Sequence, residues 1–568
     1  MKQSCLLILL LSSIFANAQQ PNRYDIVIDE VMADPAPQVG LPGNEWIELK
    51  NVSAQAFNLQ GWKLSDPASS SGPMPNYILK PDSFVIICTA SAQAAMAVFG
   101  SVITVTGFPS LDNDGDQLTI TSAQGKTIHS VRYDISWYGN ELKKDGGWTL
   151  EMIDTKNPCV GRDNWKASAN ASGGTPGHVN SVQNNNTDQS GPSLIKAYAT
   201  DSINIVLVFD EPLDSLKAAA ISNYFISDGI ALPLNALPTA PLFDRVNLKL
   251  QTALLRNKIY TVTVKQISDC AGNPVGTSNT ARVGLSSAAT AFDVVINEIL
   301  FNPWPNGTDY VELYNRSDKI IDLKQLFIAN RNNAAVISNI QQINNESSLL
   351  FPGDMIAITA DPVLVKAQYL VLHPEALIGL TSMPSFNDDK GDVILLNAQG
   401  EIIDELKYDE HWHFKLIANT EGVALERIDY NALTQNENNW HSAASSAGYG
   451  TPTYKNSQSI SGAQPKGNVY VVPEIISPDN DGRDDFATVY YEFPEPGYVA
   501  NITVFDAAGR RVRYLQQSAL CGLKGNYRWD GLGENNQRLP IGIYIIFTEV
   551  FNLNGKTKQY KQPIVLAR

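Results

Sequence analysis

The segment Tyr24–Pro35 reads YDIVIDEVMADP, and the segment Phe292–Pro303 reads FDVVINEILFNP. Further motifs repeat in the same order: EWIELKN at Glu45 as DYVELYN at Asp309, DNDGDQLTI at Asp112 as NDDKGDVILL at Asn387, GGWTLEMID at Gly146 as EGVALERID at Glu421, and GTPG at Gly174 as GTPT at Gly450. The offset between the two copies stays between 264 and 276 residues. A repeat of this length predicts a modular array in which two modules share one plan.

The chain is rich in short β-strand patterns. Runs of Val, Ile, Thr, Tyr and Phe alternate with clusters of Gly, Pro, Asn and Asp, and amphipathic helical patterns are almost absent. This spacing is typical of antiparallel sandwiches and barrels. In EWIELKN, Ile47 and Leu49 fall on one face, as do the aligned Val311 and Leu313. Period two in both copies predicts a half-buried strand, and we expect an all-β protein.

The first residues, MKQSCLLILLLSSIFANAQQ, combine one Lys, an apolar run and the small residues Ala16-Asn17-Ala18. This pattern predicts a secretory signal peptide over residues 1–18. The apolar run is shorter than the roughly 20 residues that span a bilayer. We therefore expect an exported protein, secreted or at the outer-membrane cell surface, without a transmembrane segment. The net charge of −16 argues against nucleic acid and anionic membranes as partners.

Three polar or small-residue stretches divide the rest of the chain. Val182–Pro192 has low complexity and ends in Gly-Pro, residues 286–290 are small, and residues 455–467 are again polar. Such stretches are typical of linkers. They delimit four predicted modules: 19–181, 190–285, 290–456 and 468–568.

The two long copies resemble lamin tail domains, which are Ig-like sandwiches common in secreted bacterial proteins. The motifs that carry the resemblance are IDEVMADP, NEWIELKN, NW at Asn164, GTPG at Gly174 and their counterparts. The second copy departs from the pattern where Asp309-Tyr310 replaces Glu-Trp. The resemblance implies no catalytic residues. Bacterial members of the family occur beside surface hydrolases or as stand-alone adhesive or structural modules.

The other two modules resemble further Ig-like families. Residues 190–285 are similar to the bacterial Ig-like domain of surface-layer proteins, through VLVFDEPLDSLKAAAISNYFI at Val206 and the DCAGN turn at Asp269. Residues 468–568 are similar to the Ig-like C-terminal domain of Bacteroidetes proteins exported by type IX secretion, related to the flagellar hook-capping Ig domain. The carriers are ISPDNDGRDDF at Ile476 and WDGLGENNQRLPIGIY at Trp529. This resemblance implies that the secretion machinery is a partner. The usual opening P-N-G-D-G-x-N-D differs here at its glycine and asparagine positions.

Four cysteines lie beyond the predicted signal peptide. Cys88 and Cys159 fall in the first copy, and the second copy has neither. This joint presence predicts one optional disulfide or, equally well, two buried thiols that act as small hydrophobes. Cys270 and Cys521 stand alone in their modules and are expected to be buried and inert.

The strongest polar constellation surrounds Gly482 and consists of Asp479, Asp481, Asp484 and Asp485. Alternating Asp oxygens on a tight turn can wrap a hard cation, so the turn is a candidate Ca²⁺ site that lacks the terminal Glu of an EF-hand. The alternative is a solvated turn held by Asx hydrogen bonds. The acidic runs at 112–116 and 387–392 precede strands and predict two-residue hairpin turns.

Two other sets of residues bear on chemistry. Glu30 and Glu48 recur as Glu298 and Glu312. A carboxylate pair can perform acid–base work, and polar groups bonded to backbone are the simpler interpretation.

The second set, His411 and His413, is expected on one strand face, where a zinc site would need a third ligand that the spacing does not supply. The sequence contains no G-x-S-x-G, H-E-x-x-H or Walker motif.

We therefore expect a non-enzymatic exported protein with an adhesive or scaffolding role, whose partner is a cell-surface protein or polysaccharide. One alternative is a glycan-binding module in which exposed aromatic side chains stack on sugars: Trp46, Trp62, Trp137, Trp148 and Trp304. Burial in the core explains most of these tryptophans equally well. Another is an accessory subunit of a surface hydrolase. No cofactor is expected apart from Ca²⁺ at the acidic turn.

Overall fold

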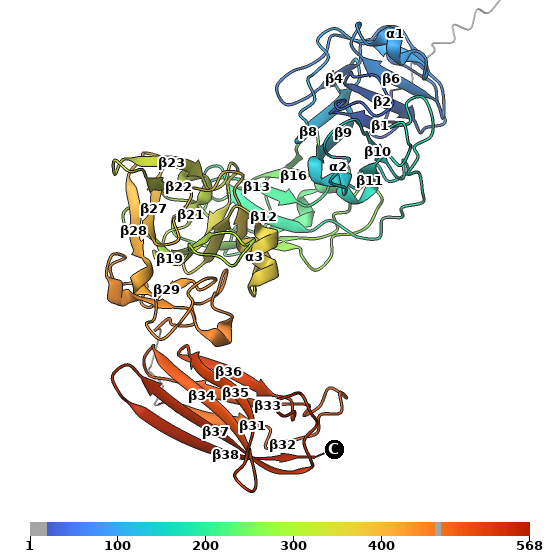
Figure 1. The fold of residues 1–568 in the computed structure, drawn as a ribbon. Helices are drawn as coiled ribbons and strands as arrows, with labels where there is room; N and C mark the ends of the chain where they lie inside the picture. The colour runs from blue at the N-terminus through green and yellow to red at the C-terminus, as the bar shows by residue number, and fades with distance from the viewer. Residues whose placement is uncertain (1–19, 461–466, 568) are drawn as a thin grey trace, which may run out of the picture. The chain divides into compact units, whose positions relative to one another are not determined.

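The computed structural model describes residues 20–460 and 467–567. The predicted signal peptide and part of the predicted linker at 455–467 lie outside these residues. The regular secondary structure of the described chain consists almost wholly of β-strands (Figure 1). It divides into two compact units, one reaching to residue 254 and including 259–283, the other made of 255–258 and the chain from 284 onward. Each unit contains two sandwich modules, which confirms the predicted all-β fold of tandem Ig-like sandwiches.

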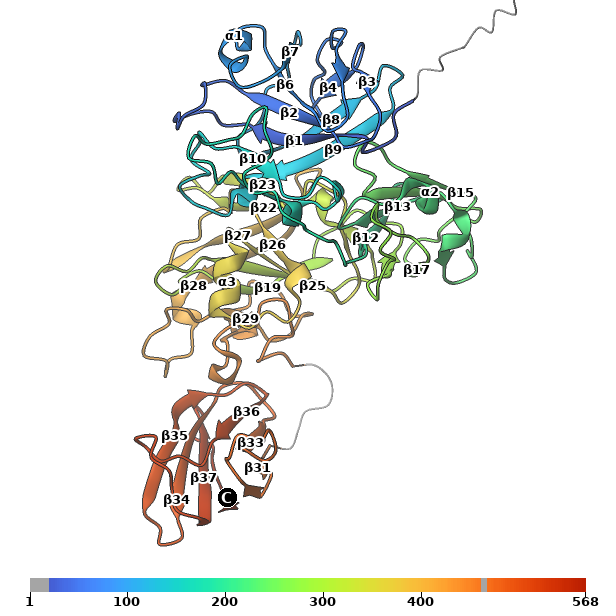
Figure 2. The same cartoon turned by 90° about the vertical axis from the view of Figure 1, so that its right-hand side faces the viewer.

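The first copy of the repeat is a sandwich of one large and one small sheet. The large sheet has the order β11 (Trp165–Ala167), β10 (Leu150–Met152), β1 (Ile26–Met32), β2 (Trp46–Asn51), β6 (Phe84–Cys88), β7 (Val102–Thr104). The small sheet and a ribbon contain β4 (Lys63–Ser65), β8 (Gly115–Thr121), β9 (Thr127–Asp134), and β3 (Phe57–Asn58) with β5 (Ile78–Leu79). The short helix α1 (Gln93–Met96) lies next to β6 and β7 (Figure 2).

The second copy repeats this plan. Its large sheet has the order β30 (Trp440–Ser442), β29 (Leu425–Arg427), β19 (Val294–Leu300), β20 (Tyr310–Asn315), β25 (Met355–Thr359), β26 (Leu377–Gly379). Its other strands are β22 (Leu326–Arg331), β23 (Ile337–Gln342), β27 (Lys390–Asn397), β28 (Ile402–Asp409), and the ribbon β21 (Ile321–Asp322) with β24 (Leu349–Leu350). Helix α3 (Pro362–Gln368) occupies the place of α1.

The two large sheets agree strand for strand. In both, the last pair is parallel, β6 with β7 and β25 with β26, and all other pairs are antiparallel. The central strand carries a β-bulge at the same place, between Ile28 and Glu30 in β1 and between Ile296 and Glu298 in β19. A bulge re-aims the side chains around it, so its retention in both copies indicates a structural role.

The two remaining modules are smaller sandwiches. The module in the first unit pairs a sheet of β12 (Leu194–Ala199), β13 (Asn204–Phe209), β16 (Arg245–Lys249), β15 (Asn235–Pro238) with one of β14 (Tyr224–Ile226), β17 (Tyr260–Val264), β18 (Thr280–Val283). It also contains helix α2 (Ser215–Ala218). The C-terminal module pairs β31 (Asn468–Val472), β33 (Ala487–Glu492), β36 (Lys524–Trp529) with β32 (Ile475–Ile476), β38 (Thr557–Leu566), β37 (Gly542–Asn552), β34 (Tyr498–Asp506), β35 (Arg511–Leu520).

The prediction of a half-buried strand at EWIELKN is wrong in one respect. Ile47 and Leu49 do share one face and are fully buried in the main core. The opposite face of β2 is buried as well, because α1 covers Trp46 in a second apolar cluster and the end of the copy covers Glu48. Burial on both faces makes this sheet a central layer.

The predicted hairpins before β8 and β27 are also wrong. Strand β7 belongs to the large sheet and β8 to the small one, so the acidic run at 112–116 joins two sheets. A tyrosine closes each turn: Tyr133 Oη donates to Asp112 O, and Tyr408 Oη donates to Asn387 O, both at 2.8 Å. The acidic residues do form a tight loop, as the turn chemistry predicted. The strands that this loop joins were predicted wrongly, because only tertiary pairing decides which strands meet.

We expect Leu49→Ala to destabilise the first copy by about 2–5 kcal/mol, because it leaves a cavity between two close-packed sheets. The matched control is Leu142→Ala, the same chemical change at a side chain that is 81% exposed, which should cost no more than about 0.5 kcal/mol. Hydrogen exchange of the β1–β2 amides during urea titration measures both. Equal effects of the two substitutions would contradict the assigned core.

Candidate functional site

Three glutamates lie side by side on the face of each large sheet that points away from the main core. In the first copy, Glu30 of β1 pairs directly with Glu48 of β2 and Glu151 of β10. In the second copy the same positions hold Glu298, Glu312 and Glu426. All six side chains are fully buried. A buried carboxylate is costly unless it accepts hydrogen bonds, so the partners of these groups decide their role.

The end of each copy supplies those partners. We name residues 174–182 the first strap and residues 450–458 the second strap. Backbone amides of each strap donate to the three glutamates in turn: Thr175 N to Glu30 Oε1 at 2.8 Å, Gly177 N to Glu48 Oε2 at 2.5 Å and Val182 N to Glu151 Oε2 at 3.1 Å. The second strap repeats the pattern: Thr451 N to Glu298 Oε1 at 2.8 Å, Thr453 N to Glu312 Oε2 at 2.6 Å and Gln458 N to Glu426 Oε2 at 2.9 Å. The repeated GTPG and GTPT motifs are therefore the docking segments of the straps.

Glycine begins each motif because the strap runs close to the sheet. A Cβ at Gly174 would lie 2.8 Å from Glu30 Oε1, and a Cβ at Gly450 would lie 2.6 Å from Tyr310 Oη. Burial and the neighbouring carboxylate raise the pKa of Glu30 and of Glu298 to about 8. These groups are bonded to backbone under a strap, as the simpler sequence interpretation expected. The glutamates hold the strap on the sheet, and their carboxylates do not face a cleft.

The two copies satisfy one backbone amide beside the bulge by different means. Ile28 N donates to His129 Nδ1 at 2.9 Å, whereas Ile296 N donates to Asp404 Oδ2 at 2.8 Å. Arg427, whose aligned residue is Met152, accompanies Asp404 and donates to Ile296 O at 2.7 Å. Burial lowers the pKa of His129 to about 4, so its ring is neutral at neutral pH. A neutral imidazole and a buried ion pair thus serve the same purpose.

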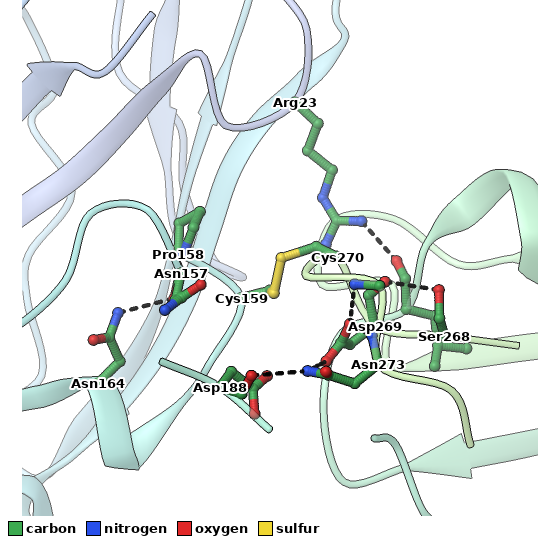
Figure 3. Close-up of a disulfide and its surroundings, with 12 residues drawn as sticks. Arg23, Asn157, Pro158, Cys159, Asn164, Asp188, Ser268, Asp269, Cys270 and Asn273 are labelled. Atoms are coloured by element: carbon green, nitrogen blue, oxygen red, sulfur yellow. Dashed lines mark hydrogen bonds between the residues drawn. A yellow bond between two sulfur atoms is a disulfide. The ribbon is translucent and has the colours of Figure 1, made fainter. Parts of the chain in front are cut away.

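The disulfide joins Cys159 to Cys270, with Cα atoms 6.2 Å apart (Figure 3). The predicted pairing of Cys88 with Cys159 is wrong. Cys88 is a free thiol buried under α1, and Cys521 is a free buried thiol as expected. Cys270 is not inert, because it lies in the DCAGN turn of the next module, which packs against the loop that carries Cys159. Counting cysteines within one module could not find a bridge between two modules.

Next to this disulfide, three acids converge. Carboxylate oxygens of Asp188, Glu211 and Asp269 all lie within 4.8 Å of one another. Asn273 Nδ2 donates to Asp269 Oδ2 at 2.8 Å and to Asp188 O at 3.3 Å (Figure 3). Burial, with Asp269 and Asp188 nearby, raises the pKa of Glu211 to about 8. These three oxygens are hard ligands of the kind that Ca²⁺ prefers, but fewer than the six to eight it takes. Sequence reasoning missed the group because its members come from three separate loops.

The predicted linker at 182–192 is bonded to its surroundings rather than free. Asn184 N donates to Ile153 O at 3.0 Å, and Asn186 N donates to Asp154 Oδ2 at 3.0 Å. Its Asn and Asp residues therefore anchor the segment against the first copy and carry Asp188 to the acidic group.

The C-terminal acidic turn brings together three of its four predicted ligands. Carboxylate oxygens of Asp479, Asp481 and Asp485 lie within 4.8 Å of one another. Asp484 contributes only backbone: it has φ +53° and its carbonyl accepts a hydrogen bond from Ser477 N. Both oxygens of Asp485 accept turn amides, from Asn480 and Gly482. The turn has the Asx bonds of a solvated loop and the carboxylates of a cation site at once.

The expectation that His411 and His413 share a strand face is wrong, and of the five candidate tryptophans only Trp304 is exposed. His411 lies in a short 3₁₀ turn and is exposed, whereas His413 is buried and bonds Ser442 Oγ, so the two rings do not share a face. Trp46 and Trp62 are core residues, and Trp137 and Trp148 pack against the core. Trp304 is 36% exposed and stands over Gly422. The alternation of polar and apolar residues along a strand could not show that both faces of the large sheet are covered by other parts of the chain.

A cleft of about 610 Å³ opens beside the second strap. Its lining includes Tyr369, Tyr454, Asn456, Lys524 and Asn526. Aromatic walls with a few amide and ammonium groups are typical of small-ligand clefts. Among residues 20–460 and 467–567, no helix is long and apolar enough to cross a membrane.

Comparison with known proteins agrees with the repeat. The family described as Lamin Tail Domain matches residues 19–134 and 287–410. A comparison with curated protein sequences found no significant match.

Among solved structures, the chain is similar to the N-terminal part of the bacterial S-layer protein SbsC, with 16% identity over 29% of this chain and 45% of that one, at a TM-score of 0.17. It is also similar to a tetra-tandem repeat from the extending region of a large adhesion protein (10% identity, 95% and 98% covered, TM-score 0.13). A third structure is PorZ, a surface component of the type IX secretion system of Porphyromonas gingivalis, with 10% identity over 93% of this chain and 81% of that one, at a TM-score of 0.16. The chain spans less than half the length of the SbsC structure, and superpositions this poor assign no function.

Loss of the bridge should weaken the first unit alone. We expect the double variant Cys159→Ser/Cys270→Ser to lose about 2–4 kcal/mol of stability there, because a bridge between distant residues restricts the unfolded chain. Cys88→Ala is the control and should leave the bridge intact. Non-reducing peptide mapping checks the pairing directly, and a cross-linked peptide containing Cys88 would refute it.

Calcium should stabilise the C-terminal module of the full chain if the acidic turn binds it. At a hundredfold excess over Kd the gain is about 2.7 kcal/mol, seen as a higher melting temperature in Ca²⁺ than in chelator. Asp481→Asn should remove the difference without disturbing the turn, because an amide oxygen still accepts from Arg483 N. Identical melting curves with Ca²⁺ and with chelator would show a solvated loop.

Proposed function

We propose that this chain is a non-enzymatic protein of the bacterial cell surface, in which tandem Ig-like modules act as an adhesive or structural spacer. The proposal rests on what the polar residues that recur in both copies do in the structure. The six buried glutamates accept strap amides, and the repeated glycines let the straps pass. The features that the two copies share hold the strap on the sandwich. A module whose recurring residues support its fold is suited to act as a spacer.

The proposed partners are a cell-surface protein or polysaccharide, together with the secretion machinery. The resemblance of residues 468–568 to type IX C-terminal domains supports export through the outer membrane of a Bacteroidetes cell. The negative charge and the predicted signal peptide support an extracellular location. A role as accessory subunit of a surface hydrolase would place the same modules beside an enzyme.

Removal of the last module tests export. We expect a chain lacking residues 468–568 to remain in the periplasm, with its signal peptide cleaved, while the full chain is digested by protease added to intact cells. A chain of similar truncated length that lacks residues 190–285 instead, with Cys159→Ser because its partner Cys270 is removed, is the control, and it should still reach the surface. Surface display of the chain without 468–568 would refute the proposed export role.

The non-enzymatic role has its own test. Purified full chain should show no hydrolase, phosphatase or nuclease turnover, and cells that display it should gain adhesion to surface proteins or polysaccharides. Turnover that is lost when cleft residues such as Tyr454 are replaced would overturn the role as a spacer.

A further inference from the structure

The bulge residue beneath the strap differs between the two copies. It is Asn297 in β19 and Asp29 in β1. Asn297 Nδ2 donates one hydrogen to Glu312 Oε1 at 2.6 Å and one to Asn456 Oδ1 of the second strap at 2.7 Å. The amide thus supplies both hydrogens needed by two acceptors that face it.

Asp29 occupies the same place without a hydrogen to give. The backbone carbonyl of Asp29 accepts a hydrogen bond from Asn180 Nδ2 at 3.0 Å. The carbonyl of Asn297 accepts the equivalent bond from Asn456 Nδ2, also at 3.0 Å, so the two straps contact the bulge residue in the same way. Asp29 is 1% exposed and Glu48 is fully buried. Asp29 Oδ1 and Glu48 Oε1 are both enclosed and have no hydrogen-bond partner. An acceptor without a donor in a dry site is strongly unfavourable.

The surrounding groups do not supply the missing hydrogen. On the sheet, Glu30 and Glu151 add two more carboxyl groups. Two ammonium groups are also present. Lys50 lies 3.9 Å from Asp82, and its charge opposes part of the rise in the Asp29 pKa. Lys166 is exposed opposite Glu151. Behind the bulge, His129 is neutral and already accepts Ile28 N.

The strap above contributes only uncharged groups to the site. Thr175 and Asn180 face it, and His178 lies exposed outside. Burial raises the pKa of Asp29 to about 7, and burial with Glu30 and Asp29 raises the pKa of Glu48 well above its usual range.

Glu30 is a weaker candidate for the proton. In the second copy Tyr310 Oη donates to Glu298 at 2.6 Å. The residue aligned with Tyr310 is Trp46, whose indole N–H is buried without a partner, as is Glu30 Oε2, so an unused donor stands at the corresponding place for Glu30 although the two are not hydrogen-bonded. The pair of Asp29 and Glu48 has no such donor.

We propose that Asp29 and Glu48 share one proton at neutral pH, and that this proton makes the hydrogen bond which the Asn297 amide makes in the second copy. At the bulge position the first strap is then held by a titratable pair and the second by an amide that does not titrate. At alkaline pH the proton leaves to solvent base and no covalent bond other than that O–H changes. Two carboxylates then face each other under the strap, and the strap opens.

The sign of the pH dependence follows from where the proton is bound. The folded state holds it at neutral pH and the unfolded chain, whose carboxyl groups titrate near pH 4, does not. The stabilisation is complete at acidic pH and is lost as pH rises through the folded pKa. Between the unfolded pKa, about 4, and the folded pKa, one proton should cost about tenfold in strap protection per pH unit, and above the folded pKa the protection should level off.

Hydrogen exchange of the full chain, read on strap peptides from about pH 6 to about pH 9 and corrected for intrinsic rates, tests this linkage. Glu30 and Glu298, each with a pKa raised to about 8, titrate in both copies in this range. In the wild type, protection of residues 174–182 should therefore fall with pH more than that of residues 450–458. Asp29→Asn should reduce the pH response of the first strap to that of the second. Asn297→Asp should increase the pH response of the second strap, and it keeps the test decisive if Asp29→Asn folds poorly.

Asp82→Asn is the matched control, because it removes an exposed carboxylate beside Lys50 and should leave the pH response unchanged. Three outcomes would overturn the proposal. Asp29→Asn could lose protection at the same pH as the wild type, or Asn297→Asp could leave the pH response of the second strap unchanged. Restored protection at high pH on adding Ca²⁺ would show that the site binds a cation instead of a proton.

Discussion

The hydrogen bonds between strap amides and buried glutamates are the interaction on which both copies depend. A two-layer sandwich buries one face of each sheet, and the other face of the large sheet would ordinarily meet water. Here that face carries three carboxylates that are removed from water and held by backbone N–H groups. These bonds are directional, and a buried carboxyl group left without them would be strongly unfavourable. They fix where the end of each copy lies, and with it the start of the next module.

This constraint explains which parts of the repeat are alike and which drift. Glu30, Glu48 and Glu151 recur with the glycine and threonine of the strap, because each needs the other. The groups around the bulge vary more freely, since an imidazole or an ion pair can hold the same amide. The chain preserves hydrogen-bond satisfaction rather than particular side chains. Buried polar networks tolerate replacement only when each donor still meets an acceptor.

The sequence predicted the elements well and their partners poorly. Period two placed Ile47 and Leu49 on one buried face correctly, because alternation is a local property of a strand. It could not reveal that Glu48 is buried too, since its cover arrives some 130 residues later along the chain. The bridge from Cys159 to Cys270 and the cluster of Asp188, Glu211 and Asp269 join separate modules or loops, so no local pattern announces them. The acidic turn at Asp479 was found because its ligands are adjacent in sequence.

The bridge from Cys159 to Cys270 also has a mechanical meaning. A spacer at a cell surface is pulled from its two ends, and load passes along whichever covalent path is shorter. The sulfur bond spans a separation of 111 residues, so tension bypasses everything between the two cysteines. About 380 Å of contour length is thereby withheld from extension, even if that region unfolds. The first unit is inextensible across this stretch, whereas the second unit, whose described residues include no disulfide, can lengthen under the same force.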